Sequence, residues 1–156
     1  MNKPYTMKFK LETFSVHDSR TPEGKTYKAG VPLRSSEDLD RVARGLYAEL
    51  DADKEHFVLV ALNNKNRMTG HKLISTGSVT ASLVDPKSVF TAALELQAVA
   101  LLCVHNHPSG DPQPSQEDIT LTRRLKECAE LLNFRLLDHV VLGDDRYFSF
   151  SDKGML

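Results

Sequence analysis

The sequence lacks the features that mark several large classes of protein. Its 156 residues include only two cysteines, Cys103 and Cys128, which are too few for a disulfide framework. No apolar run reaches the roughly 18 residues that a membrane span requires. Residues 1–10 also lack the apolar core of a signal peptide. We therefore expect a cytoplasmic protein that does not enter a membrane.

An excess of charge of either sign is missing as well. The chain has 20 Lys and Arg against 21 Asp and Glu, which gives a net charge of −1. Proteins that hold nucleic acid mainly by its phosphates usually carry a basic excess. Direct nucleic-acid binding is therefore unsupported, although a local basic patch stays open. The length fits one domain with a core of its own, and internal repeats are absent.

The first 35 residues differ in character from the rest of the chain. Residues 7–14 alternate well enough for a short strand. Residues 18–32 are polar and contain two prolines and two glycines, which is typical of an extended segment. We expect an N-terminal strand and extended arm over residues 1–35, followed by a single domain over residues 36–156.

Helical and strand patterns alternate through residues 36–156. Apolar residues at helical spacing predict three helices, and short apolar runs predict strands between them. The expected helices cover 35–50, 85–96 and 115–132, and the expected strands cover 57–62, 68–76, 98–104, 134–142 and 147–150. A turn at residues 63–66 makes the second strand antiparallel to the first. This order predicts an α/β fold with a mixed central β-sheet flanked by helices.

Residues 105–118 carry the clearest chemical signal. His105 and His107 follow the apolar run 98–104, and both project to one face because side chains alternate along a strand. A loop stiffened by three prolines then returns the chain to Asp118, in the first turn of a helix, where the helix dipole favours an ionised carboxylate. Two imidazoles and one carboxylate can hold zinc with a fourth position open for water.

Each part of this pattern also has a simpler explanation. Ser115 and Asp118 fit a capping box, in which an acid three residues after a serine only starts a helix. Two histidines one residue apart are weak evidence alone. The combination is more specific, and a cap can coexist with metal ligation because it fixes where the ligand points. Cys103 shares strand parity with the histidines, but a buried apolar thiol explains it better than a metal contact.

The spacing resembles the JAMM signature of the JAB/MPN metalloprotease superfamily: His105 and His107, seven residues, Ser115, two residues and Asp118. Residues 76–78, 105–112, 115–118 and 137–143 are similar to its RadC-like branch, whose members are often labelled DNA repair proteins. The resemblance covers residues 36–156 and implies a JAB/MPN-like fold, with layers like those of cytidine deaminases. It does not extend to the arm. The helix-hairpin-helix segment of longer relatives is not found, which weakens the expectation of direct DNA binding.

The resemblance also implies roles for individual residues. His105, His107 and Asp118 would bind Zn²⁺, and Ser115 would hydrogen-bond the developing oxyanion or the metal-bound water. The reaction would be hydrolysis of a peptide or isopeptide bond in a protein or peptide substrate. Asp138 and His139 also match the family and are candidates for supporting the ligands from behind. For His139, a satisfied core histidine is the alternative.

The general base is the open question. In active members a glutamate on an earlier strand takes a proton from the water, and counting back from Gly77 places it at position 72, which is Lys72 here. A protonated lysine cannot accept a proton, and it repels a metal cation. The other candidates are His71 after a one-residue strand shift, Asp85, which the N-cap role explains better, and the arm acids Glu12, Asp18 and Glu23.

Two functions therefore stay open. One is a zinc-dependent metallohydrolase of JAMM type. The other is a non-catalytic, metal-binding JAB interaction module in DNA maintenance or on a mobile element, which Lys72 favours. Two rival enzyme classes are excluded by pattern. His-Asn-His nucleases spread their three residues over a larger unit, and zinc deaminases need His-x-Glu and Pro-Cys-x-x-Cys, which the sequence lacks.

Overall fold

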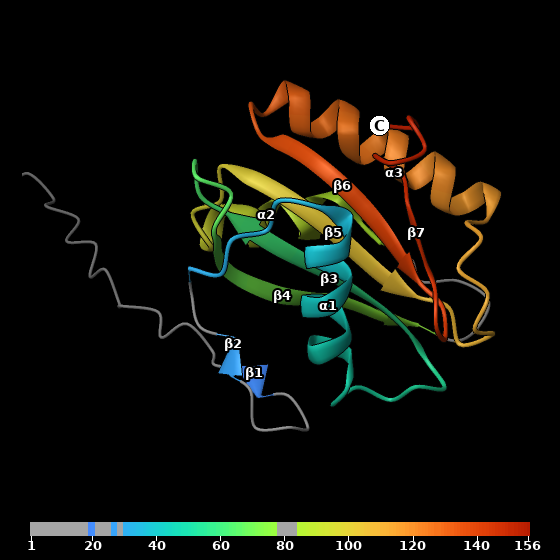
Figure 1. Cartoon of the computed structure of the whole chain (residues 1–156). Helices are drawn as coiled ribbons and strands as arrows, with labels where there is room; N and C mark the ends of the chain where they lie inside the picture. The colour runs from blue at the N-terminus through green and yellow to red at the C-terminus, as the bar shows by residue number, and fades with distance from the viewer. Residues whose placement is uncertain (1–18, 21–25, 28–29, 78–83) are drawn as a thin grey trace, which may run out of the picture.

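The computed structural model describes residues 19–20, 26–27, 30–77 and 84–156 (Figure 1). Two short strands, β1 (Ser19–Arg20) and β2 (Thr26–Tyr27), pair antiparallel in the N-terminal part. The strand expected at residues 7–14 lies outside the described residues. The predicted domain from residue 36 onward contains the remaining helices and strands.

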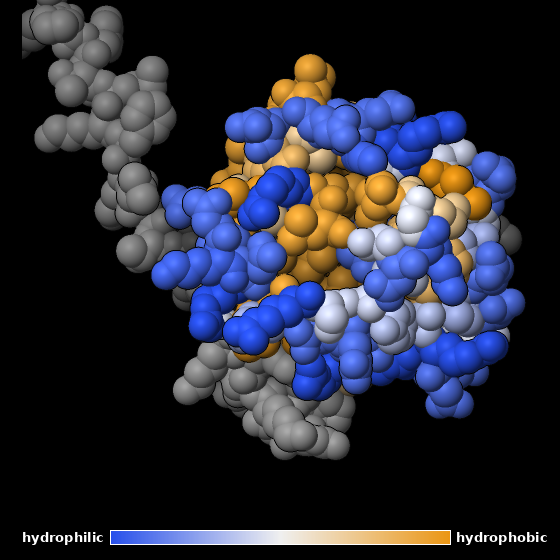
Figure 2. All heavy atoms as spheres, turned by 45° about the horizontal axis from the view of Figure 1, so that its top comes forward, coloured by the Kyte–Doolittle hydropathy of each residue, from blue (hydrophilic) through white to orange (hydrophobic). Residues whose placement is uncertain are grey.

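Three helices lie in the described part of the chain: α1 (Ser36–Tyr47), α2 (Pro86–Glu95) and α3 (Gln116–Leu131). Within these described ranges, none combines the length and the apolar character that crossing a bilayer needs. Figure 2 shows one face of the molecule, where an apolar area lies among hydrophilic residues.

Five strands form the central sheet, in the order β4-β3-β5-β6-β7. They are β3 (Glu55–Leu62), β4 (Met68–Gly77), β5 (Ala100–Asn106), β6 (Arg135–Leu142) and β7 (Tyr147–Ser149). Strands β5 and β6 run parallel, and the other neighbouring pairs run antiparallel. The mixed sheet and the hairpin of β3 and β4 that the sequence predicts are confirmed.

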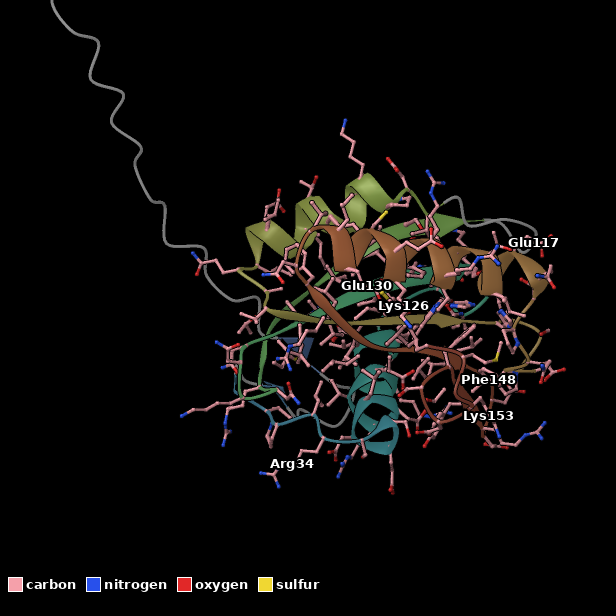
Figure 3. The ribbon with its side chains drawn as sticks, turned by 90° about the horizontal axis from the view of Figure 1, so that it is seen from above. Arg34, Glu117, Lys126, Glu130, Phe148 and Lys153 are labelled. Carbon is pink, nitrogen blue, oxygen red and sulfur yellow. The ribbon has the colours of Figure 1, made fainter. Side chains whose placement is uncertain are left out.

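The helices cover both faces of this sheet. Seen from above, α1 lies on one side and α2 and α3 lie on the other (Figure 3). Alternation along the strands divides the core in the same way. Val58 and Val60 of β3 pack with the apolar face of α1, whereas Phe57 and Leu59 pack with α2 and α3. Each buried side chain of this size contributes about 1.5–3 kcal/mol, so both clusters hold the layers together.

Three capping residues begin the helices where the sequence predicts. The side chains of Ser35, Asp85 and Ser115 accept hydrogen bonds from backbone N–H groups two or three residues further on. These bonds satisfy donors that the first turn of a helix leaves unpaired. The first helix is shorter than predicted. It ends at Tyr47, because the N–H of Leu50 donates to the Tyr47 carbonyl in a turn (3.0 Å).

The C-terminal end of β5 brings distant segments together. Strand β3 runs antiparallel to β5 with Phe57 opposite His105, so the beginning of β3 lies beside the end of β5. The loop after β5 leads into α3, which packs on the same face of the sheet as Phe57. The beginning of β3, the end of β5 and the first turn of α3 therefore meet at one edge.

Candidate metal centre

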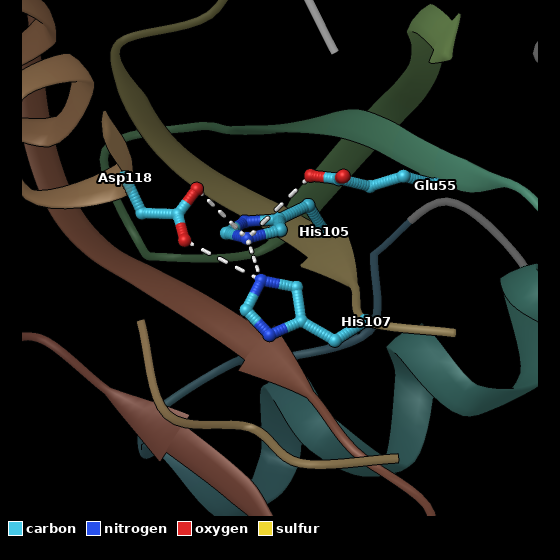
Figure 4. Close-up of side chains that lie close together, drawn as sticks. All are labelled: Glu55, His105, His107 and Asp118. Carbon is cyan, nitrogen blue, oxygen red and sulfur yellow. Dashed lines mark hydrogen bonds and ion pairs between the residues drawn. The ribbon is translucent and has the colours of Figure 1, made fainter. Parts of the chain in front are cut away.

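Four side chains converge at the end of β5: Glu55, His105, His107 and Asp118 (Figure 4). One nitrogen or oxygen atom from each lies within 4.8 Å of the corresponding atoms of the other three. Two imidazoles and two carboxylates in this arrangement could hold a metal ion. The structure brings together all three ligands that the sequence predicts and adds Glu55 to them.

The two histidines present the same ring nitrogen to this centre. The Nε2 atoms of His105 and His107 lie 3.1 Å apart. On its other side, the His107 ring places Nδ1 2.8 Å from the Asp111 carbonyl oxygen, which can only accept a hydrogen bond. Nδ1 of His107 therefore carries the proton, which leaves the Nε2 lone pair free in the neutral ring.

Asp118 is oriented by the capping box at the start of α3. The backbone N–H and the hydroxyl of Ser115 both donate to Asp118 Oδ2, at 2.7 and 2.8 Å. In return the Asp118 N–H donates to Ser115 Oγ at 3.1 Å. Asp118 Oδ1 then lies 3.2 Å from His105 Nε2, and Oδ2 lies 3.4 Å from His107 Nε2. The cap thus places the carboxylate against both imidazoles.

Glu55 reaches the same centre from the beginning of β3. It precedes Phe57 by two positions and shares its face, and Phe57 lies opposite His105. Its Oε1 atom lies 4.0 Å from His105 Nε2. Partial burial raises the pKa of the Glu55 carboxyl above its ordinary value. Local sequence patterns do not reveal Glu55 as a member of this centre, because its place depends on the pairing of β3 with β5.

Lys72, expected at the position of the general base, lies elsewhere. It stands opposite Leu59 on β4, and its amino group pairs with the Glu95 carboxylate of α2. Strand β4 is the edge strand and is separated from β5 by β3, so the acid at this centre comes from β3 instead. The expectation that position 72 lies at this centre is therefore wrong, and Glu55 is the fourth side chain there.

Among the described residues, the other two candidates for the base, His71 and Asp85, do not belong to the cluster of four. His71 stands opposite Val60 in the register of β4 and β3. The Asp85 side chain accepts the Lys87 N–H at 3.0 Å, as the N-cap prediction requires. The arm residues Glu12, Asp18 and Glu23 lie outside the described residues.

The two residues expected to support the ligands point to opposite faces of β6. His139 is fully buried, and its Nε2 lies 2.8 Å from His105 Nδ1. The Asp138 carboxylate instead accepts hydrogen bonds from its neighbour's N–H (2.7 Å), from the Ser149 hydroxyl (2.6 Å) and from the Ser151 N–H (3.0 Å). Only His139 touches a histidine of the centre, while Asp138 holds the end of β7 against β6. Cys103 is buried in the core, as predicted.

The electrostatics of the centre favour a bound cation. Burial would raise the pKa of Asp118, but the imidazoles of His105 and His107 beside the carboxylate outweigh burial and hold that pKa well below its usual range. The same contact with Asp118 raises the pKa of His107. The carboxylate is therefore ionised near neutral pH, which is the form that binds a metal.

Comparison with known proteins agrees with this arrangement. The family model described as "RadC-like JAB domain" matches residues 33–155. The UPF0758 protein YsxA of Bacillus subtilis (strain 168) is 48% identical over 103 residues, which are 66% of this chain and 45% of the relative. A UPF0758 protein of Pelobacter propionicus is 46% identical over 110 residues, 70% of this chain and 48% of the relative. The chain spans about half the length of such relatives. Because the family model covers most of the sequence, including all four residues of the centre, the chain belongs to the RadC-like JAB domain family.

Proposed function

We propose that this chain is a zinc-dependent metallohydrolase of JAMM type that cleaves a peptide or isopeptide bond in a protein or peptide substrate. The observation that carries the proposal is Glu55, because a carboxylate beside the two histidines and Asp118 supplies the proton acceptor that such hydrolysis needs. Hydrolysis of JAMM type uses a glutamate on an earlier strand, and Glu55 lies on β3, which precedes β5.

The separations between the donor atoms support zinc. A tetrahedral zinc ion with bonds of about 2.0–2.1 Å keeps its ligand atoms about 3.3 Å apart. The two histidine Nε2 atoms are separated by 3.1 Å, and the Asp118 oxygens lie 3.2 and 3.4 Å from them. Three ligands at this spacing leave a fourth position open. Zinc bound there would lower the pKa of a water molecule and polarise the scissile carbonyl.

Glu55 then acts as the general base and afterwards as the general acid. Its carboxylate stands 4.0 Å from the nearest histidine nitrogen, further away than Asp118, which suits a group that contacts the water. It accepts the proton of the attacking water and returns it to the departing amine. The raised pKa of Glu55, caused by burial, brings its proton affinity closer to that needed near neutral pH.

Ser115 orients Asp118 within this scheme. Its hydroxyl hydrogen is donated to Asp118 Oδ2, and its oxygen accepts the Asp118 N–H. A direct hydrogen bond from Ser115 to the developing oxyanion stays a prediction, and it requires the hydroxyl to turn away from Asp118. Lys72 at the expected position of the base favoured the alternative, a non-catalytic module, whereas the Glu55 carboxylate at the centre supports the enzyme.

Replacing Glu55 by Gln tests the proposal. The zinc-loaded wild type is expected to cleave a fluorogenic peptide or a lysine-linked isopeptide, and Glu55→Gln is expected to slow cleavage about 10²–10⁴-fold while zinc content is kept. Lys72→Gln is the matched control and is expected to keep the wild-type rate, because Lys72 pairs with Glu95 away from the centre. No cleavage of either probe by the zinc-loaded wild type, or a wild-type rate in Glu55→Gln, would contradict the proposal.

A further inference from the structure

A chain of buried polar groups lies behind the metal centre. Thr122 of α3, His139 of β6 and His105 of β5 are each at most 1% exposed. Thr122 Oγ1 lies 2.6 Å from His139 Nδ1, and His139 Nε2 lies 2.8 Å from His105 Nδ1. The His139 ring lies between Phe57 and Phe150, with ring centres 5.4 and 5.1 Å away. Polar groups buried among aromatic rings need complete hydrogen bonding, so the direction of each bond matters.

The hydrogen bond that Thr122 makes at one end of this series fixes the direction of the others. The Thr122 hydroxyl lies 2.6 Å from the Asp118 carbonyl oxygen, which can only accept, so the hydroxyl hydrogen points there. Thr122 Oγ1 must then accept the proton on His139 Nδ1. The His139 ring is fully buried between two aromatic rings, where a charged imidazolium would be costly, so it is neutral, has one proton, and its Nε2 is an acceptor. His139 Nε2 in turn takes its hydrogen bond from the Nδ1–H of His105.

We propose that Thr122 and His139 are positioning residues that hold His105 as its Nδ1–H tautomer, so that its Nε2 lone pair faces the metal ion. This inference rests on the metal binding in the proposed function. It adds an explanation of why Nε2 of His105, and not Nδ1, is the atom available to the metal. His107 achieves the same result directly, through the Asp111 carbonyl. His105 lies inside the sheet, where β3 and β6 flank its strand on both sides, so Thr122 and His139 together hold its proton in place; we call these two residues the relay.

The relay also links two ligands of the centre. The carbonyl that accepts the Thr122 hydroxyl belongs to Asp118, whose carboxylate lies 3.2 Å from His105 Nε2. Loss of the Thr122 oxygen would leave His139 Nδ1–H without an acceptor in a buried site. His139 would then favour the opposite tautomer and donate from Nε2 to His105. His105 would be left with its proton on Nε2, the atom that must bind the metal.

Two variants of Thr122 separate this role from packing. Thr122→Val keeps the shape of the side chain and removes the acceptor, whereas Thr122→Ser restores it. Nitrogen-15 NMR of the metal-free protein at about pH 9, well above the ordinary pKa of an imidazole, reports the tautomer. We expect Nδ1–H at His105 in the wild type and in Thr122→Ser, and Nε2–H in Thr122→Val. Zinc affinity, measured by competition with a chelator, is expected to fall about 10–100-fold in Thr122→Val and to recover in Thr122→Ser.

The outcomes are distinct from those of the proposed function. An Nε2–H tautomer of His105 in the metal-free wild type would overturn the inference even if Thr122→Val failed to fold. The inference would also be overturned if Thr122→Val folds and keeps both the His105 tautomer and the zinc affinity of the wild type. A lower melting temperature with unchanged zinc affinity would assign Thr122 a purely structural role and would also overturn it. A wild type that binds zinc through the predicted tautomer but cleaves no substrate would support this inference and count against hydrolysis.

Discussion

Gly110 shows how one residue sets the shape of the loop between His107 and Asp118. Its φ angle is +80°, and its N–H donates to the His107 carbonyl at 2.9 Å. A Cβ atom at this position would lie 2.3 Å from an Asp144 carboxylate oxygen. The glycine therefore lets the loop lie against the turn between β6 and β7. That position keeps the Asp111 carbonyl against His107 Nδ1.

Alanine at Gly110 is expected to destabilise the fold more than alanine at Gly154. Both glycines have positive φ, but nothing lies within 4 Å of a Cβ built at Gly154. Gly154→Ala should cost about 1 kcal/mol from backbone conformation alone. Gly110→Ala should cost about 1–3 kcal/mol more because Asp144 must move, and it should weaken zinc binding. Urea unfolding followed by circular dichroism measures both, and equal losses of stability would contradict the steric argument.

Two adjacent polar residues of β6, Asp138 and His139, have different roles because they point to opposite faces of the sheet. Asp138 and His139 are both buried, but alternation directs them to opposite faces. His139 faces the metal centre, while Asp138 accepts two hydrogen bonds from the segment Ser149–Ser151 and thereby holds the chain after β7. Sequence similarity makes the pair look like one functional unit, whereas the strand separates it into a positioning residue and a structural one.

Replacing Asp138 by alanine is expected to lower stability without changing the metal centre. The substitution leaves the Ser149 hydroxyl and two backbone N–H groups without their acceptor, at a cost of about 2–4 kcal/mol in the free energy of unfolding. Zinc affinity should stay within about threefold of the wild type, since ligand-supporting residues typically change it 10–100-fold. Asp145→Ala, an exposed acid nearby, should change stability by less than about 0.5 kcal/mol. A selective loss of zinc affinity in Asp138→Ala would overturn this division.

The same elements explain which parts of the centre were predictable from the sequence. His105, His107 and Asp118 lie in one continuous segment, so strand alternation and a helix cap were enough to bring them together. Glu55 lies in a different segment, and its position depends on β3 inserting between β4 and β5. Strand order is set by packing across the whole sheet, which local patterns do not contain. The expectation that position 72 lies at the centre was wrong for that reason. The hairpin of β3 and β4 was predicted correctly, but the sequence does not show that β3, and not β4, is the strand beside β5.

Metal binding at this centre is expected to be coupled to folding of the whole domain. The four residues of the centre come from β3, β5, the loop after it and α3, so they meet only when the sheet and its helical layer are assembled. A ligand that binds only the folded state stabilises it by about 4 kcal/mol at a free concentration 1,000 times its dissociation constant. Zinc should therefore raise the melting temperature, and EDTA should reverse the effect. His107→Ala should abolish the rise because it removes one of the two imidazoles.

Cys103 offers an independent measure of the same coupling. It is fully buried on β5, and burial raises the pKa of its thiol to about 12, so an alkylating reagent reaches a reactive form only when the fold opens. Cys128 on α3 is partly exposed and should react in the native protein. If the reagent captures the globally open state, a stabilisation of about 4 kcal/mol slows Cys103 labelling about 1,000-fold. Mass spectrometry of the two cysteine peptides with zinc and with EDTA gives the ratio. Zinc bound to the thiols themselves would slow labelling in His107→Ala as well, whereas zinc at this centre protects Cys103 only in the protein that keeps both histidines.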